Sequence, residues 1–148
     1  MKQLKLDLTK SIINIDLQDD CEINGLFIGK DSDSIASTII INFAKSNINS
    51  RIIIKAVLYD KATINLDCKL IIPKGIKNID GYLDIKVLNL SYAAKIDIAP
   101  GLEILENDVK CGHALTIGKP DQVEIEYLKS RGLTERQAIN LIVQGFLL

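Results

Sequence analysis

The sequence predicts a mainly β fold that ends in two short helices, and three observations lead to that prediction. Up to about residue 117, isoleucine, leucine and valine recur in short runs in which apolar and polar residues alternate. Such alternation buries one side of a strand and leaves the other in water, and β-branched residues fit a pleated sheet. Turn-forming residues separate the runs. After Gly118 the apolar spacing becomes that of helices.

The clearest strands are four alternating runs. They span residues 13–17, 39–43, 52–58 and 64–72. Aspartate, serine, asparagine, proline and glycine gather between or after these runs, and such residues favour turns. We therefore expect turns at residues 31–34, 45–47, 73–75 and 80–81.

Short strands at fairly even spacing are compatible with a β-sandwich, a barrel or a β-solenoid. Asparagine and aspartate stand between aliphatic positions, as at Asn14 and Asp16, and the chain has no Trp, three Phe and four Tyr. This composition slightly favours the solenoid, because bulky rings fit poorly in the narrow core of stacked coils. No strict repeat period is visible, although a solenoid would be expected to show one. The residue pattern alone leaves all three architectures open.

Two helices are predicted from capping residues and apolar spacing. Asp121 followed by Glu124 is an acidic variant of the capping box, and Gly132 is well placed to end the first helix. Thr134 and Gln137 open the second helix by the same device. The apolar face of the first helix is expected to contain Val123, Tyr127 and Leu128, and that of the second Ala138, Ile139, Leu141, Ile142 and Phe146. We expect a β core over residues 1–118 and a helical hairpin over 119–148, in one compact unit.

Composition excludes several classes of function. The 148 residues carry a net charge of −1, and no basic face indicates nucleic acid or an anionic membrane as partner. The charged start lacks the apolar core of a signal peptide, and no apolar run reaches the ~18 residues that span a bilayer. The three cysteines lack CxxC spacing, so we expect free thiols and a cytoplasmic protein.

Sequence signatures of enzymes are also missing. The chain contains neither the GxxxxGK[ST] loop that binds nucleotides nor the GxSxG elbow of hydrolases. With a single histidine, His113, a serine triad has little room, and the carboxylates are scattered among the expected turns. We therefore expect that the protein is not an enzyme.

Several segments near the C-terminus carry a family resemblance. Residues 108–118 read DVKCGHALTIG, residues 127–133 read YLKSRGL, residues 138–146 read AINLIVQGF, and residues 99–104 read APGLEI. In this order they resemble the C-terminal part of the SufB/SufD family of iron–sulfur cluster assembly proteins. The good correspondence covers residues 80–148, whereas the first half matches only in character.

The resemblance implies a right-handed parallel β-helix with C-terminal helices, and a non-catalytic scaffold role in a SUF-type assembly complex. It implies that the C-terminal helices bind a SufC-like ABC-type ATPase. It also implies pairing through the β-helix, as a homodimer or as a heterodimer with a paralogue. A transient iron–sulfur cluster is the only cofactor it suggests. Ala114 replaces a glutamate common in SufB sequences, and Ala93 and Ala94 stand near the place of a SufB cysteine, so the match is closer to SufD.

Cys111 and His113 are the candidate metal ligands. Two residues apart on a strand means the same face, and thiolate with imidazole suits iron or zinc. Two ligands are an incomplete site, which a two-fold dimer would double. The alternative is a small buried cysteine and a hydrogen-bonded interface histidine. Cys68 lies in phase with core leucines and is expected in the core, and Cys21 is given no role.

The helical hairpin has two interpretations. Its apolar stripe can seal the open end of a solenoid, which exposes core residues and needs a cap. It can also bind the ATPase through Tyr127, Arg131 and Phe146, because aromatic residues and arginine are frequent interface hot spots. Two further functions remain open at this stage: a structural or regulatory ATPase partner that holds no cluster, and a zinc-binding β-solenoid of unrelated function.

Overall fold

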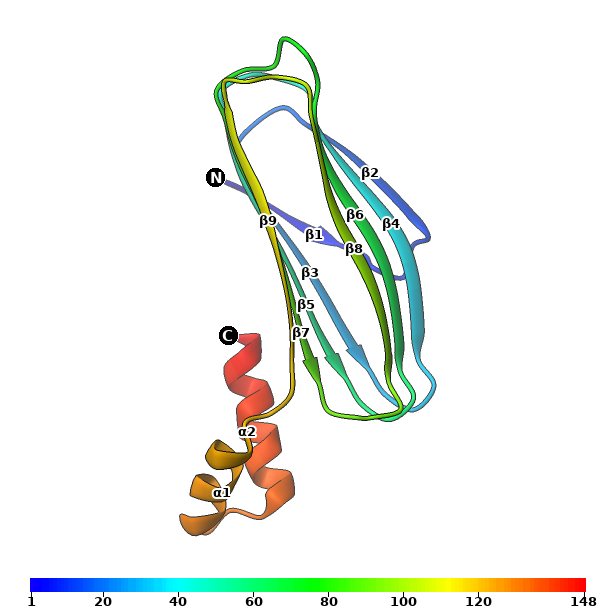
Figure 1. Cartoon of the computed structure of the whole chain (residues 1–148), viewed down its shortest axis with the longest axis vertical. Coiled ribbons are helices and arrows are strands. Elements are labelled where there is room, and N and C mark those ends of the chain that lie inside the picture. The colour runs from blue at the N-terminus through cyan, green and yellow to red at the C-terminus, as the bar shows by residue number, and fades with distance from the viewer.

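The protein is a β-solenoid of about four turns followed by two helices (Figure 1). The computed structural model describes residues 1–148. One sheet, called sheet A, contains β1 (Lys2–Leu6), β3 (Cys21–Gly29), β5 (Ile48–Leu58), β7 (Ile79–Asn89) and β9 (Val109–Gly118) in that order. The other, sheet B, contains β2 (Ile12–Leu17), β4 (Ser34–Phe43), β6 (Thr63–Ile72) and β8 (Lys95–Ile104).

All neighbouring strands in both sheets are parallel, and the chain alternates between the sheets once in every half turn. Parallel pairing with alternation between two sheets distinguishes a solenoid from the antiparallel sandwich and barrel folds. The β-solenoid and the C-terminal helices that the resemblance implied are therefore confirmed. No helix is long and apolar enough to cross a membrane.

The turns of the solenoid differ in length, which explains why the sequence shows no strict period. In sheet A, Ile23 pairs with Ile52, Ile52 with Leu83, and Leu83 with His113, and no two of these steps along the chain are equal. Sheet B varies more widely, because the step from β2 to β4 is clearly shorter than the step from β6 to β8. The strands keep their pairing while the connecting turns gain or lose residues, so the repeat exists in space rather than in the sequence.

A single aliphatic core runs between the two sheets and contains 24 buried residues. Inward-facing side chains of β5 and β6 supply much of it, and all of them are almost completely buried: Ile52, Ile54, Ala56, Leu58, Ile64, Leu66, Cys68, Leu70 and Ile72. Each fully buried Leu or Ile contributes roughly 1.5–3 kcal/mol from removal of apolar surface from water. Phe43 is the only aromatic side chain among the fully buried residues. The expected core position of Cys68 is confirmed.

Asparagine and aspartate occupy the turn positions at which the backbone has a left-handed conformation. Asp31, Asn47, Asp60 and Asn78 have φ between 52° and 64°, a region that these two residue types tolerate better than most. They stack from one coil to the next: the Asn78 amide donates a hydrogen bond of 2.8 Å to the Asn47 side-chain oxygen. The predicted turns at 31–34, 45–47 and 73–75 are confirmed, with Ser34 already the first residue of β4.

The turn expected at residues 80–81 is wrong, because Asp80 and Gly81 lie inside β7. Gly81 points into the core, where a Cβ would lie 2.8 Å from Cζ of Phe43. The glycine is needed for close packing in the core rather than for a change of chain direction. A single sequence cannot distinguish a glycine in a turn from a glycine in a closely packed strand. Either glycine can follow a polar residue and precede a run of apolar residues.

Helix α1 (Gln122–Ser130) and helix α2 (Glu135–Leu147) form the predicted hairpin. The Asp121 side chain accepts a hydrogen bond from the backbone N–H of Val123, and Gly132 follows α1 with φ +99°. Thr134 and Gln137 form the expected capping box at the start of α2. The predicted apolar face of α1 is wrong at Val123 and Tyr127, which are 76% and 59% exposed. Leu128 is half-buried, and Ile125 is the buried residue of the helix.

The hairpin does not seal the open end of the solenoid. Helix α2 packs through Val143 against Val57 and Leu88, which form a separate small cluster. Val57 lies between two core residues of β5 and therefore points to the outer face of sheet A. Figure 1 shows the two helices beside one end of the strands, joined directly to the end of β9. The sealing interpretation fails because the apolar stripe of α2 has a different apolar surface to bury.

Candidate functional site

Strand β9 is the last strand of sheet A and has β7 as its only neighbour. Cys111 pairs with Gly81 and His113 pairs with Leu83, and both β7 residues face the core. Cys111 and His113 therefore share the inner face of the solenoid, as their spacing predicted. No further coil covers this face, so it forms an open end at which core-facing positions are only partly buried.

The two candidate ligands differ in their surroundings. Cys111 is half-buried and packs against the core, whereas His113 is exposed. Burial raises the pKa of the Cys111 thiol; a hydrogen bond from the Gly112 backbone lowers it and the nearby Asp80 carboxylate raises it. The free thiol is therefore protonated at neutral pH, and a bound metal would have to displace its proton. His113 reaches solvent at the rim of the same face.

One chain supplies two ligands at this place and no more. No group of three or more His, Cys, Asp or Glu side chains converges anywhere in the protein to hold a metal ion. Cys21 and Cys68 are buried in other coils, and burial raises the pKa of the Cys68 thiol to about 12. Burial also raises the pKa of the Cys21 thiol. Cys21 is the first residue of β3, and neither buried thiol adds to the pair on β9.

The hairpin presents a second candidate surface on its outer side. Tyr127 and Arg131 are exposed, as a partner-binding role requires. Phe146 differs, because it is half-buried in the cluster that attaches α2 to sheet A, with the Lys55 ammonium 5.8 Å from its ring centre. Sequence reasoning missed Val123 as a surface residue because its helical spacing resembles that of a core position.

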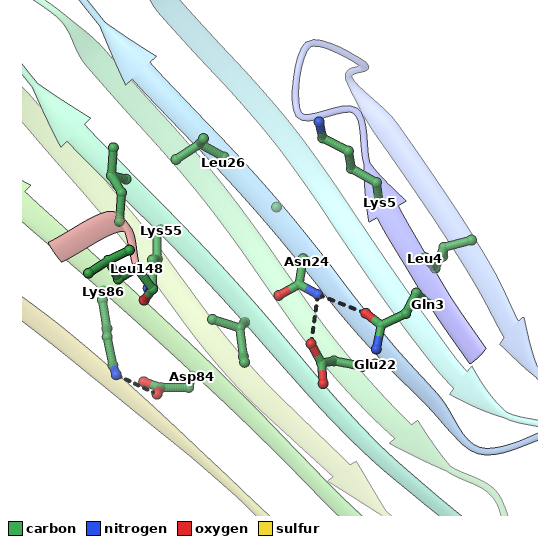
Figure 2. Close-up of a pocket in the computed structure, with 13 residues that line it drawn as sticks. Gln3, Leu4, Lys5, Glu22, Asn24, Leu26, Lys55, Asp84, Lys86 and Leu148 are labelled. Carbon is green, nitrogen blue, oxygen red and sulfur yellow. Dashed lines mark hydrogen bonds and ion pairs between the residues drawn. The ribbon is translucent and has the colours of Figure 1, made fainter. Parts of the chain in front are cut away.

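A groove of about 730 Å³ crosses the outer face of sheet A beside the end of α2 (Figure 2). The strands β1, β3, β5 and β7, helix α2 and Leu148 supply its 13 lining residues, so no local sequence pattern could reveal it. The groove contains one ion pair, in which Lys86 lies 3.3 Å from the Asp84 carboxylate, and the Asn24 amide donates to the Glu22 carboxylate at 3.0 Å. It contains no cysteine or histidine, so the candidate ligands belong to the open end of the solenoid instead.

Comparison with known proteins identifies the family of the chain. Residues 4–146 match the family model described as SUF system FeS cluster assembly, SufBD core domain. The chain belongs to the SufB/SufD family. The match extends well upstream of residue 80, so the first half of this SufBD core shares the family pattern that its sequence showed only in character.

Three relatives give the extent of the similarity. The SufD protein of Escherichia coli is 33% identical over 98 residues, which are 66% of this chain and 23% of that protein. SufD of Bacillus subtilis is 34% identical over 111 residues, 75% of this chain and 25% of the relative. A SufBD family protein of Pyrococcus horikoshii is 36% identical over 92 residues, 62% of this chain and 20% of the relative. This SufBD core thus spans a quarter or less of their lengths. The family takes part in iron–sulfur cluster assembly.

Proposed function

We propose that this chain is a non-catalytic scaffold subunit that presents Cys111 and His113 to an iron–sulfur cluster during assembly or transfer. The observation that carries the proposal is the position of this pair on the open inner face of β9. Elsewhere in the molecule the inner face is filled by aliphatic core, and the other two cysteines are buried. Only at this end can a thiol and an imidazole on the same strand reach an incoming ligand.

The ligand set is completed by a second SufBD chain in this proposal. Strands β8 and β9 each have one free edge, and unpaired N–H and C=O groups of an edge strand are a template for pairing with another chain. A two-fold axis at this edge would place two cysteines and two histidines near each other. Either a homodimer or a heterodimer with a paralogue meets this requirement.

The cluster is cargo in this mechanism, and the chain's own residues hold and release it. Cys111 contributes a soft thiolate and His113 a borderline imidazole, a combination suited to iron. Burial raises the pKa of the Cys111 thiol, so cluster binding would displace its proton and cluster release would return it. No bond-breaking step is assigned to the chain.

A SufC-like ABC-type ATPase is the proposed partner of the helical hairpin. Val123, Tyr127 and Arg131 offer an apolar and cationic surface on α1 and the following turn that no other part of the chain covers. Aromatic residues and arginine are frequent hot spots of such interfaces. The three free thiols fit a reducing cytoplasm, where the complex would act.

Anaerobic reconstitution with iron and sulfide tests the ligand role. Wild type should develop the absorbance of an iron–sulfur cluster, and the Cys111→Ala, His113→Ala double variant should lose most of it. Cys21→Ala is the matched control, because it removes a thiol that is buried elsewhere. Equal cluster content in the double variant and in wild type would show that the ligand assignment is wrong.

The same preparations separate the two alternatives. Elemental analysis of protein isolated without added metal would reveal a zinc protein. Co-purification of an ABC-type ATPase, with no cluster formed under any reconstitution condition, would identify a partner that holds no cluster. Light scattering before and after reconstitution measures whether the chain is paired when it binds cluster.

A further inference from the structure

Tyr82 on β7 lies against Gly112 on β9, and Gly112 is the residue between the two candidate ligands. The two residues are direct partners in the parallel ladder. A Cβ atom added to Gly112 would meet Cε2 of the tyrosine ring at 3.2 Å and Cδ2 at 3.4 Å. The ring therefore covers the backbone of Gly112, on the outer face of sheet A, in the space that a side chain would otherwise fill. Covering a strand glycine with a cross-strand aromatic ring is a known way to stabilise sheets.

On the inner face of the same two strands, the glycine is on β7 and the larger side chain is on β9. There Gly81 of β7 stands beside Cys111 of β9, and its Cβ position lies 3.6 Å from the cysteine Sγ. No side chain at the paired position of the neighbouring strand therefore supports Cys111 from that side. On the opposite face, the Tyr82 ring of β7 lies against Gly112 and adds a side-chain contact to the backbone ladder between the two strands.

Strand β9 has less support than the interior strands of sheet A. It has a neighbour on one side only, and the helices that follow it pack on β5 and β7 rather than on its free edge. Strand segments with few contacts open at low free energy cost. Any twist or lift of β9 at Gly112 would turn Cys111 and His113 away from each other, because they flank this residue.

We infer that Tyr82 is a positioning residue for the Cys111–His113 pair and acts through Gly112. The inference rests on the proposed function, in which this pair binds metal. The ring limits movement of the strand from the outer face, so that the two side chains on the inner face keep a common direction as a ligand arrives. Tyr82 itself is 40% exposed and does not touch the ligand side. The ring can lie against the backbone at this position because Gly112 has no side chain.

The test compares three variants of the full chain: Tyr82→Phe keeps the ring, Tyr82→Ser removes it, and Gly112→Ala places a methyl group against it. The probe is Co²⁺ alone under anaerobic conditions, read by the thiolate-to-cobalt absorption band. Tyr82→Phe should bind as wild type does. Tyr82→Ser and Gly112→Ala should bind about tenfold more weakly, the usual effect of losing a residue that orients a ligand.

Two further readouts decide the inference without metal: the alkylation rate of Cys111 by iodoacetamide, and amide hydrogen exchange along β9. Both should rise in Tyr82→Ser relative to Tyr82→Phe. If Tyr82→Ser only lowers the thermal unfolding midpoint, while Co²⁺ affinity, alkylation and exchange equal those of Tyr82→Phe, the role is structural and the inference is overturned. If wild type shows no cobalt band, the proposed ligand site fails, and the alkylation and exchange results still decide whether Tyr82 positions the strand.

Discussion

Lys55 on β5 donates a hydrogen bond of 2.8 Å to the carbonyl oxygen of Leu148, just beyond the end of α2. The same ammonium group donates to the carbonyl oxygen of Phe146 at 3.0 Å. The last carbonyl groups of a helix lack partners within the helix and carry partial negative charge, so a lysine is a favourable neighbour. Together with the Val57, Leu88 and Val143 cluster, Lys55 attaches the hairpin to the outer face of sheet A.

Lys55→Met should weaken this attachment, because it keeps the aliphatic stem and removes the charged donor. We expect a loss of about 1.5–3 kcal/mol in the free energy of unfolding, as for a hydrogen bond that involves a charged group. Amide exchange in α2 should rise more than exchange in the β core. Lys86→Met is the matched control, since Lys86 is the ladder neighbour of Lys55 but pairs only with Asp84 at a partly exposed position. Equal effects of the two substitutions on α2 would contradict the attachment role.

Gly81→Ala should destabilise the solenoid core. The added methyl group would lie 2.8 Å from Cζ of Phe43, a ring that is completely buried. Overpacking of this kind costs ~1–3 kcal/mol. Gly118→Ala is the control, because a Cβ there meets nothing within 4 Å. Chemical denaturation of both variants measures the difference, and a Gly81→Ala protein as stable as the control would show that the core can accommodate the methyl group.

The sequence predicts much of the fold because its strands alternate so clearly. The runs at 39–43, 52–58 and 64–72 all lie in strands, and the caps at Asp121 and Thr134 are where the sequence places them. The residue pattern alone did not predict the architecture. The solenoid repeat depends on which strands pair across a full turn of the chain, and turns of unequal length conceal it from a search for a strict period. The family resemblance supplied what periodicity could not.

The candidate site was predictable only where local geometry defines it. Cys111 and His113 share a face because strands have a period of two, whatever the fold. The surroundings of the pair depend on long-range packing: Tyr82 over Gly112 is a contact between strands that are a full solenoid turn apart in the chain. For the same reason the outward position of Val123 and the inward position of Phe146 could not be read from helical spacing, because the surface that receives α2 is formed by β5 and β7.

Stability at alkaline pH should depend on Cys68. Burial raises the pKa of its thiol from 9.0 to about 12 in the folded protein, whereas the unfolded chain keeps the ordinary value. The folded state therefore favours the protonated thiol. This contribution is fully present below pH 9, and it is lost as the pH rises from 9 toward 12 because the unfolded state releases the proton first.

Cys68→Val provides the comparison. Between pH 9 and 11 the unfolding free energy of wild type should fall more steeply than that of Cys68→Val, with an extra slope of up to about 1.4 kcal/mol per pH unit. All other titrating groups are common to both proteins, so the difference in slope isolates Cys68, even if the substitution also changes stability at neutral pH. Parallel curves would show that the Cys68 thiol has the same pKa in the folded and the unfolded protein.

If the proposed ATPase partner binds the hairpin, its binding should depend on the outer surface of α1. Val123→Ser and Tyr127→Ser change exposed side chains, so each should alter the unfolding free energy by no more than about 0.5 kcal/mol. Each should nevertheless weaken retention of a SufC-like ABC-type ATPase in a pull-down, and Tyr127→Ser should do so by about thirtyfold, the effect expected for an interface hot spot. Leu141→Ser is the matched control, because Leu141 is an exposed apolar residue on α2 instead. Loss of ATPase binding in Leu141→Ser, with normal binding in Tyr127→Ser, would show that the ATPase docks on α2 rather than on α1.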